Sequence, residues 1–584
     1  MEYKIQFGSL RSDRKNQSDQ KKFRIAILGD FSARANRNLS RQSDELANIK
    51  PFKVHHENLD TLMNQLGLVV KLPAGASGAE INVPIQSMDD FHPDQLYRNV
   101  PLFEKLSNLR AKLLDPTSFD KAAAAVRSLA CDPELGRISI PNTSLSTNVP
   151  RKRIDSFLDL LDAPIAEAKE VDLKTMLRDI VGPHVVSDMQ GQKELVQAID
   201  SSLSNLMNQI LHHPDFQSLE SLWRSLEFLL HRVELDEGVE LVLYDLHAGE
   251  LAADLASHEQ LEQSALFQLL VENPTSDANQ GAFAVIVGSF VWEYIPPHAE
   301  LLARIAQIAA ASGAPWITSM DRAVLDLPRR AEIHPLILQA WDALRSLPAA
   351  PYLGLTVPRF MLRWPYGKKT ESIDSFAYEE FNTRAGLSSM LWGNGAFAVA
   401  CSLARSFVQN GLSGMKLTDC LTLEDIPFYY YSDQYGDQIA LPCTERLIQE
   451  KVAQQVSSQG WMPLVSMKGR SEIRVGGIRA VAGTPLAGPW APITIEAMPV
   501  SSGVSNENQW QQAAAIEDAS PAQSATEPSS GGAESAMEQP PATEESVDEL
   551  DQLLAALDTP PAASETPPTD DGMDPELAAL LADL

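Results

Sequence analysis

The sequence has 584 residues, which is long enough for several domains or for one large domain with appendages. Its formal net charge of −31 is unevenly spread, because residues 501–584 contain 18 Asp and Glu and no Lys or Arg, which leaves −13 for the first 500 residues. This balance argues against binding to a phosphate backbone, so we expect no nucleic acid partner.

The cysteines and the apolar runs indicate a reducing, aqueous compartment. Four cysteines lie far apart and none forms a C-x-x-C pair, which argues against a disulfide framework or a zinc knuckle. The N-terminus has no apolar signal core, and the longest apolar runs carry Arg, Gln or Pro. We therefore expect a cytoplasmic chain without membrane insertion.

The first region, residues 1–140, alternates predicted strands and helices. Residues 23–31, FRIAILGDF, form a short apolar run that is typical of a buried strand. Residues 81–91 predict an alternating strand followed by a turn. Residues 92–114 have apolar side chains at helical spacing and predict one helix with a proline near its start, and residues 118–130 predict another helix.

Two further regions follow before the acidic end of the chain. Residues 141–180 begin as a Pro/Ser/Thr-rich linker and continue as an amphipathic helix. Residues 181–498 alternate helices and strands, which favours an α/β fold with mixed sheets covered by helices. The predicted elements of this region are helices near 195–211, from 214 and over 298–312, and strands over 239–246, 282–290 and 314–320.

Residues 210–231, ILHHPDFQSLESLWRSLEFLLH, contain three histidines and raise the question of a metal site. The His-Pro-Asp start at 213–215 is typical of a helix N-terminus. Because His212 and His213 precede the helix and His231 lies about 24 Å further along its axis, the three cannot share one metal ion. We favour capping and packing, with a contact surface as the alternative and a metal-dependent hydrolase as a third hypothesis. The predicted core face is Phe216, Leu219, Leu222, Trp223, Leu226 and Leu230.

The remaining enzyme signatures are incomplete. The His-Glu pairs within 55–60 and 257–262 lack the second histidine of H-E-x-x-H, and PYGKKT at 365–370 lacks the upstream glycine of a P-loop. WGNGAF at 392–397 indicates a turn or a close backbone approach. Adjacent carboxylates such as residues 379–380 are expected to be solvated. No catalytic, cofactor or metal site is predicted, and we expect a chain that is not an enzyme.

Residues 499–584 are rich in Ser, Pro, Ala and Glu, and we expect a disordered acidic tail. Two islands, 546–558 and 574–584, place leucines at helical spacing after an acidic start, and each is too short to be a stable helix alone. They suit helix-in-groove docking to an unknown partner, with a solubilising tail of chance helicity as the alternative. Their leucines are Leu550, Leu553, Leu554, Leu557, Leu577, Leu580, Leu581 and Leu584.

Several stretches resemble the contractile sheath of type VI secretion systems. Three of them, at 23–34, 55–67 and 81–113, resemble the small sheath subunit (TssB, or VipA), and the last includes SMDDFHPD. The histidine-containing helix at 210–230 resembles the large subunit (TssC, or VipB). The match to the large subunit continues in order at LARIAQIAAASGAPWITSM, YLGLTVPRFMLRWPYG, FAYEEF, LWGNGAFAVA and LPCTERLI.

This resemblance implies a fusion of the two sheath subunits. In that family, small–large heterodimers assemble around an inner tube, and contraction of the sheath propels the tube. The implied partners are other sheath subunits, the inner tube protein, the baseplate and an AAA+ disassembly ATPase. The ATPase contact would correspond to the predicted helix in 141–180, with packing on its own fold as the alternative. The apolar residues of that helix are Phe157, Leu158, Leu160 and Leu161.

The sequence also departs from the family pattern. The large subunit normally continues past the stretch that corresponds to 460–485 into a further helical and strand segment, where this chain has its acidic tail. The strand end at 288–293 is also altered. These departures motivate an alternative function, namely a non-polymerising adaptor at a sheath end or baseplate that recruits a partner through its tail.

Overall fold

The computed structural model describes residues 22–129 and 173–490, which belong to one compact unit. Short gaps within these ranges fall at 75–78, 186–190, 234, 236–237, 277–280, 329, 385 and 433–434. The expected linker and the helix after it lie mostly outside the described residues, and the acidic tail lies wholly outside them. Across the described ranges, no helix combines the length and apolarity that a membrane span requires.

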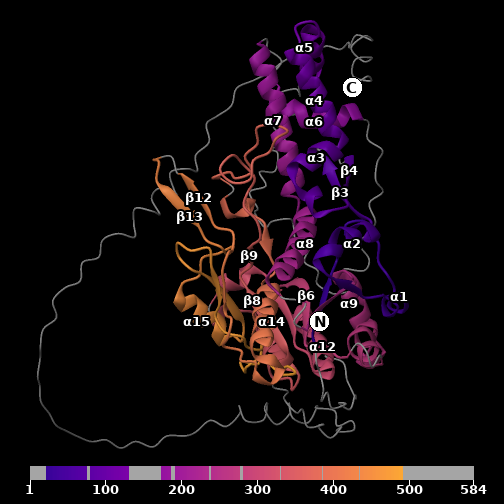
Figure 1. The fold of residues 1–584 in the computed structure, drawn as a ribbon, viewed down its shortest axis with the longest axis vertical. Helices are drawn as coiled ribbons and strands as arrows, with labels where there is room; N and C mark the ends of the chain where they lie inside the picture. The colour runs from indigo at the N-terminus through magenta and orange to yellow at the C-terminus, as the bar shows by residue number, and fades with distance from the viewer. Residues whose placement is uncertain are drawn as a thin grey trace, which may run out of the picture. The chain divides into compact units, whose positions relative to one another are not determined.

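A nine-stranded sheet forms the centre of the described residues (Figure 1). Its inner strands β5, β1, β6, β7, β8 and β14 are parallel, and β2, β15 and β11 are antiparallel to their neighbours. In sheet order, the strands are β11 (Thr422–Leu423), β15 (Ile473–Val475), β14 (Met462–Ser466), β8 (Leu353–Val357), β7 (Trp316–Met320), β6 (Val285–Trp292), β1 (Phe23–Gly29), β5 (Val239–Asp245) and β2 (Phe52–Val54).

Strand β1 lies in the interior of this sheet, between two strands from much later in the chain. Its register pairs Ile25 with Leu241 of β5 and with Val285 of β6. All seven β1 residues are buried, because a parallel strand covered on both faces has no solvated side. Successive β1 side chains alternate between two cores, with Ile25 in one and Ala26 in the other.

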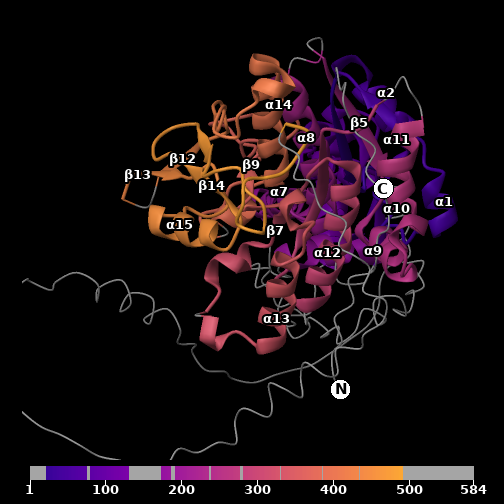
Figure 2. The ribbon, with the colours of Figure 1, turned by 90° about the horizontal axis from the view of Figure 1, so that it is seen from below.

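Helices cover both faces of the sheet. The face that carries Ile25 packs against α8 (Pro214–Arg232) and α14 (Gly395–Gly414). The opposite face packs against α9 (Ala248–Ser257), α12 (Pro296–Ser312) and α13 (Pro335–Arg345). Figure 2 shows these two groups on opposite sides of the strands. This arrangement confirms the predicted α/β class.

A second group of helices packs beside the sheet, in the upper part of Figure 1. Here α4 and α5, from before residue 130, contact α7, and α6 also packs on α7. The elements of this group are α2 (Leu59–Leu66), α3 (Pro93–Asn99), α4 (Pro101–Leu114), α5 (Phe119–Ser128), α6 (Leu173–Val181), α7 (Gln192–Leu211) and the hairpin of β3 (Leu68–Ala74) and β4 (Ala79–Ile85).

Smaller elements complete the described residues. Two more antiparallel pairs are β9 (Phe360–Met361) with β10 (Trp392–Gly393), and β12 (Tyr429–Ser432) with β13 (Gln438–Leu441), of which the second is a hairpin. The short helices are α1 (Ser43–Ala47), α10 (Ala265–Phe267), α11 (Asn273–Ser276) and α15 (Glu450–Ser458).

One predicted helix is wrong as a single element. Residues 92–114 form α3 and α4 instead, with Val100 between them in an extended conformation (φ −97°, ψ 114°). Pro101 explains the break, because it lacks an amide N–H and its ring disfavours the helical conformation of the preceding residue. The other strands and helices predicted within the described ranges are confirmed, with ends shifted by a few residues.

Candidate functional site

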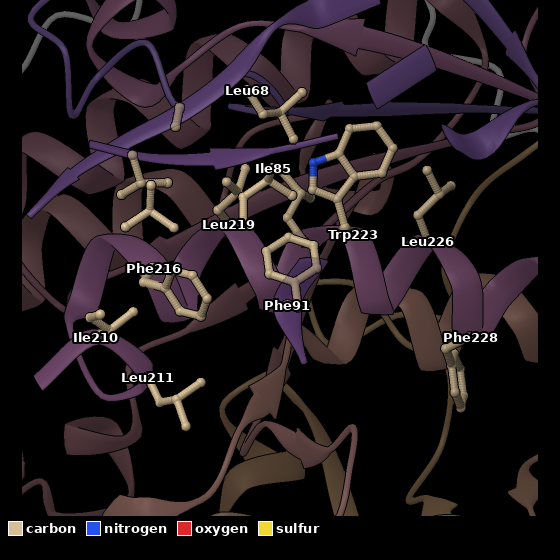
Figure 3. Packing of buried hydrophobic residues seen from close by; sticks show 14 of the residues in the cluster. Leu68, Ile85, Phe91, Ile210, Leu211, Phe216, Leu219, Trp223, Leu226 and Phe228 are labelled. Carbon is tan, nitrogen blue, oxygen red and sulfur yellow. The ribbon is translucent and has the colours of Figure 1, made fainter. Parts of the chain in front are cut away.

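The described residues before 130 and those after 172 meet along a continuous surface, which we call the joint. Helix α8 supplies its apolar centre. The buried Trp223 donates its indole N–H to the carbonyl oxygen of Phe31 at 3.0 Å, and the two rings meet edge to face with centroids 5.2 Å apart. Phe216 packs edge to face on Phe91 at 5.7 Å. Figure 3 shows this helix face turned toward the β3–β4 hairpin.

The three histidines of 210–231 occupy separate places around α8, as their spacing predicts. The ring of His213 accepts the backbone N–H of Asp215 at 3.3 Å and caps α8, and burial lowers the pKa of this ring. His212 lies 3.3 Å from the buried carboxylate of Glu380. His231 is 62% exposed at the far end of the helix, where its ring lies 4.8 Å from that of His56. Capping and packing are therefore confirmed for His213 and for the apolar stripe of α8.

A buried polar network joins the ends of β1 and β5. The carboxylate of Asp245 accepts the backbone N–H and the hydroxyl of Ser32, at 3.1 and 2.8 Å, and the guanidinium of Arg34 at 3.2 Å. Arg34 also pairs with Glu250, in the first turn of α9, at 2.6 Å. Burial opposes ionisation of Glu250, but its hydrogen bonds to Arg34 and Arg41 outweigh burial and lower its pKa.

The carboxylates of this network are compensated by groups from the chain itself. Asp30 accepts the backbone N–H groups of Arg34 and Ala35 at 2.8 and 2.9 Å, and burial raises its pKa. The guanidinium of Arg34 fills the space between Asp245 and Glu250. These side chains therefore form a buried ion-pair network. It holds the residues before 130 and those after 172 in one orientation.

Further polar contacts extend the joint along α3 and α4. The carboxylate of Asp94 accepts the backbone N–H groups of Asp374 and Ser375 at 3.1 and 2.9 Å. Burial opposes ionisation of Asp94, but the hydrogen bonds from Ser375 and Asp374 have the larger effect, and the net pKa of Asp94 is lowered. Arg110 of α4 pairs with Asp200 of α7 at 2.5 Å.

A second buried network supports α8 from its other side and corrects one expectation. Glu380 is only 2% exposed, so the expectation that the 379–380 pair is solvated is wrong for this carboxylate. Arg363 bridges Glu380 at 2.7 Å and Glu220 of α8 at 2.8 Å. Burial opposes ionisation of Glu380, but the charge of Arg363 and the hydrogen bond from His212 outweigh it and lower the pKa to about 2.

The glycines of WGNGAF have the predicted role of close approach. A Cβ on Gly395, at the start of α14, would lie 2.6 Å from the hydroxyl of Thr356 in β8 and 2.8 Å from Leu464 in β14. A Cβ on Gly393 would lie 2.8 Å from Leu362. These contacts let α14 pack directly on the sheet.

The residues predicted for recognition lie elsewhere in the chain. The candidate ATPase contact Phe157, Leu158, Leu160 and Leu161 and all eight tail leucines fall outside the described residues. Arg34 and Asp245 at the joint, and Arg363 and Glu380 in the network behind α8, were not singled out as a site from sequence. More than 200 residues separate Arg34 from Asp245, and no local pattern indicates that they meet.

Both regions that meet at the joint are similar to known protein families. Residues 4–128 match the family "Type VI secretion system, VipA, VC_A0107 or Hcp2", and residues 193–481 match "EvpB/VC_A0108, tail sheath N-terminal domain" (VipB). A relative from Pseudomonas aeruginosa PAO1, named "Type VI secretion system sheath protein TssC1", is 31% identical over 293 residues. That alignment covers 47% of this chain and 58% of the relative, so the chain spans little more than half the length of this curated protein.

The fold and the joint define a two-part α/β structural unit in which the two parts share one sheet. Two regions of the chain match type VI secretion sheath families, so one polypeptide carries a VipA-like region and a VipB-like region. The resemblance of both parts to sheath subunits is therefore confirmed.

Proposed function

We propose that this chain is a structural subunit of a type VI secretion contractile sheath, a fused protomer that supplies the small and the large subunit together. The observation that supports this most directly is the position of β1, which comes from the VipA-like region and pairs with two strands of the VipB-like region. Fusion keeps the ratio of the two parts at one to one and raises their effective concentration.

In this proposal, the protomers assemble in the cytoplasm around an inner tube and contract to propel it. Repeated heterologous contacts between copies would generate an open helical polymer. The energy would be stored in the packing of the extended sheath, so the role requires no catalysis by this chain. Its partners would be other sheath subunits, the inner tube protein, the baseplate and an AAA+ disassembly ATPase that binds near Phe157 and Leu161.

Electron microscopy of the purified full chain tests this proposal. The chain is imaged alone, and then with separate small and large sheath subunits and with inner tube protein. Tubes or tube segments that contain the chain are the expected result. A particle that stays monomeric in every mixture would contradict the fused-protomer function.

An adaptor at a sheath end or baseplate is the second candidate function. It is favoured by the match to the sheath family ending at residue 481, after which the chain continues into its acidic stretch. An adaptor lacking residues 499–584 should lose capture of its partner and keep the circular dichroism and unfolding midpoint of the full chain. Unchanged capture would count against this function.

A further inference from the structure

An aromatic groove of about 630 Å³ opens between the β12–β13 hairpin and the turn at 365–371. Trp364, Phe428 and Tyr430 line its apolar side. Lys369, Thr370 and Glu371 line its polar side. Its volume falls within the range of protein ligand sites, and its mixture of aromatic and charged groups suits an amphipathic occupant.

The aromatic side chains of this groove are unusually exposed. Trp364 is 48% exposed and Tyr430 is 47% exposed, although both rings carry large apolar surfaces. The rings belong to one contiguous set, because Trp364 donates its indole N–H to the carbonyl oxygen of Phe428 at 3.1 Å, and Phe428 meets Tyr430 edge to face at 4.7 Å. A contiguous exposed aromatic surface is typical of a binding site.

The groove is held in shape before anything binds. Arg363, buried between Glu220 and Glu380, donates to the carbonyl oxygen of Trp364 at 3.1 Å. On the polar side, the hydroxyl of Thr370 donates to the carbonyl oxygen of Pro365. A preformed groove reduces the ordering cost of binding.

The end of the chain offers a segment of matching chemistry. The heptapeptide Glu-Leu-x-x-Leu-Leu-Ala occurs twice, at 549–555 and 576–582, and its leucines at i, i+3 and i+4 would lie on one helical face. Residues 501–584 carry only negative charge, whereas the exposed Lys368 and Lys369 lie on the turn at the groove. The segment therefore has leucines that can pack on the aromatic side of the groove and carboxylates that can pair with the two lysines.

The length of chain between groove and segment permits this contact. Trp490 is the last described residue, and 58 residues separate it from Glu549. A random coil of that length would have a root-mean-square end-to-end distance of about 40–45 Å. The copy at 549–555 has the shorter connection and hence the higher effective concentration at the groove.

We propose that residues 549–555 dock as a helix in the aromatic groove of the same chain. Leu550, Leu553 and Leu554 would cover Trp364 and Tyr430, and the acidic flanks of the segment would face Lys368 and Lys369. This mode of helix-in-groove recognition would cover the exposed rings.

Site-specific photo-crosslinking in the full chain tests this proposal. A benzophenone amino acid replaces Leu553, and mass spectrometry maps the linked peptides after irradiation of dilute protein. Docking predicts links within a single chain to residues 364–371 or 428–432. Links between two chains would assign the groove to a second copy and overturn the proposal, as would links elsewhere on the chain or no link at all.

Matched variants identify the groove as the receptor. Tyr430→Glu places a charge on the aromatic side, and we expect the crosslink yield to fall about tenfold, which is typical for loss of an interface anchor. Lys369→Glu reverses the charge of an exposed side chain on the turn, and it should also reduce the yield. Tyr435→Glu, at the 82% exposed tip of the hairpin, is the control and should leave the yield unchanged. Equal yields in all three variants would overturn the proposal.

Discussion

At the scale of single residues, buried charge determines how α8 packs within the VipB-like region. Arg363 is almost fully buried with two carboxylates, Glu220 from α8 and Glu380 from the loop that also holds Asp374 and Ser375. A buried ion pair adds little net stability compared with an apolar pair, but breaking it leaves an uncompensated charge. The network therefore favours one arrangement of α8 against that loop.

Glu380→Gln is expected to destabilise the protein by about 3–5 kcal/mol, because Arg363 and Glu220 would remain buried with one carboxylate fewer. Urea unfolding followed by tryptophan fluorescence measures the change. Glu379→Gln is the control, since this neighbouring carboxylate is exposed and should change stability by less than about 0.5 kcal/mol. Similar losses for the two variants would contradict the role assigned to Glu380.

The same carboxylate predicts a pH dependence of stability. The pKa of Glu380 is lowered from 4.5 to about 2 in the folded protein, so the unfolded state binds the extra proton first as pH falls. The contribution of Glu380 is therefore complete above about pH 4.5 and is lost as pH falls toward 2. Between pH 5 and pH 3, the free energy of unfolding should fall more steeply for the native sequence than for Glu380→Gln. Parallel slopes would contradict this assignment.

At the scale of secondary-structure elements, β1 carries the connection between the two regions. Ile27 is fully buried in the core that also contains residues of α8 and α14. Ile27→Ala is expected to cost about 2–5 kcal/mol, because it leaves a cavity in a close-packed interior. Val291→Ala in β6 is the control, since that side chain is 45% exposed.

Hydrogen exchange distinguishes a shared cooperative unit from two separate ones. Because β1 pairs with strands on both sides, Ile27→Ala should speed the exchange of backbone amides in β8 and in α4 by a similar factor. Faster exchange confined to residues 22–129 would mean that the VipB-like region is stable without β1.

Local patterns predicted the elements well, and the associations between distant residues poorly. The apolar stripe of α8 and the buried run of β1 follow from periodicity alone, and Pro101 carried the signal for the break between α3 and α4. The burial of Glu380 depends on Arg363, which lies 17 residues away and in turn pairs with Glu220, a further 143 residues away. Two adjacent acidic residues in a sequence do not indicate which distant residues will pair with them. Likewise, nothing in FRIAILG specifies which two strands it will join.

At the scale of the whole molecule, the connection between the two regions should be dispensable for their association. A specific protease site placed within residues 141–153 would cut the chain between them. The two fragments should remain together in gel filtration and separate only in denaturant, because β1 and the α8 face stay buried across the cut. After cleavage, unfolding becomes a dissociation, so its midpoint should rise with protein concentration, unlike that of the intact chain.

Arg34→Ala makes this last experiment quantitative. Removing the guanidinium leaves Glu250 and Asp245 buried without their closest cation, although Arg41 stays 3.6 Å from Asp245. Loss of one partner from a desolvated charge pair costs about 2–5 kcal/mol, mainly through faster dissociation. In the intact Arg34→Ala variant the two regions stay tethered by the chain. Their high effective concentration then offsets part of the lost free energy of association. Cleaved Arg34→Ala should therefore separate at concentrations where the cleaved native sequence stays associated. Fragments of the native sequence that separate at micromolar concentration would instead show that the tether, and not the shared sheet, holds the two regions together.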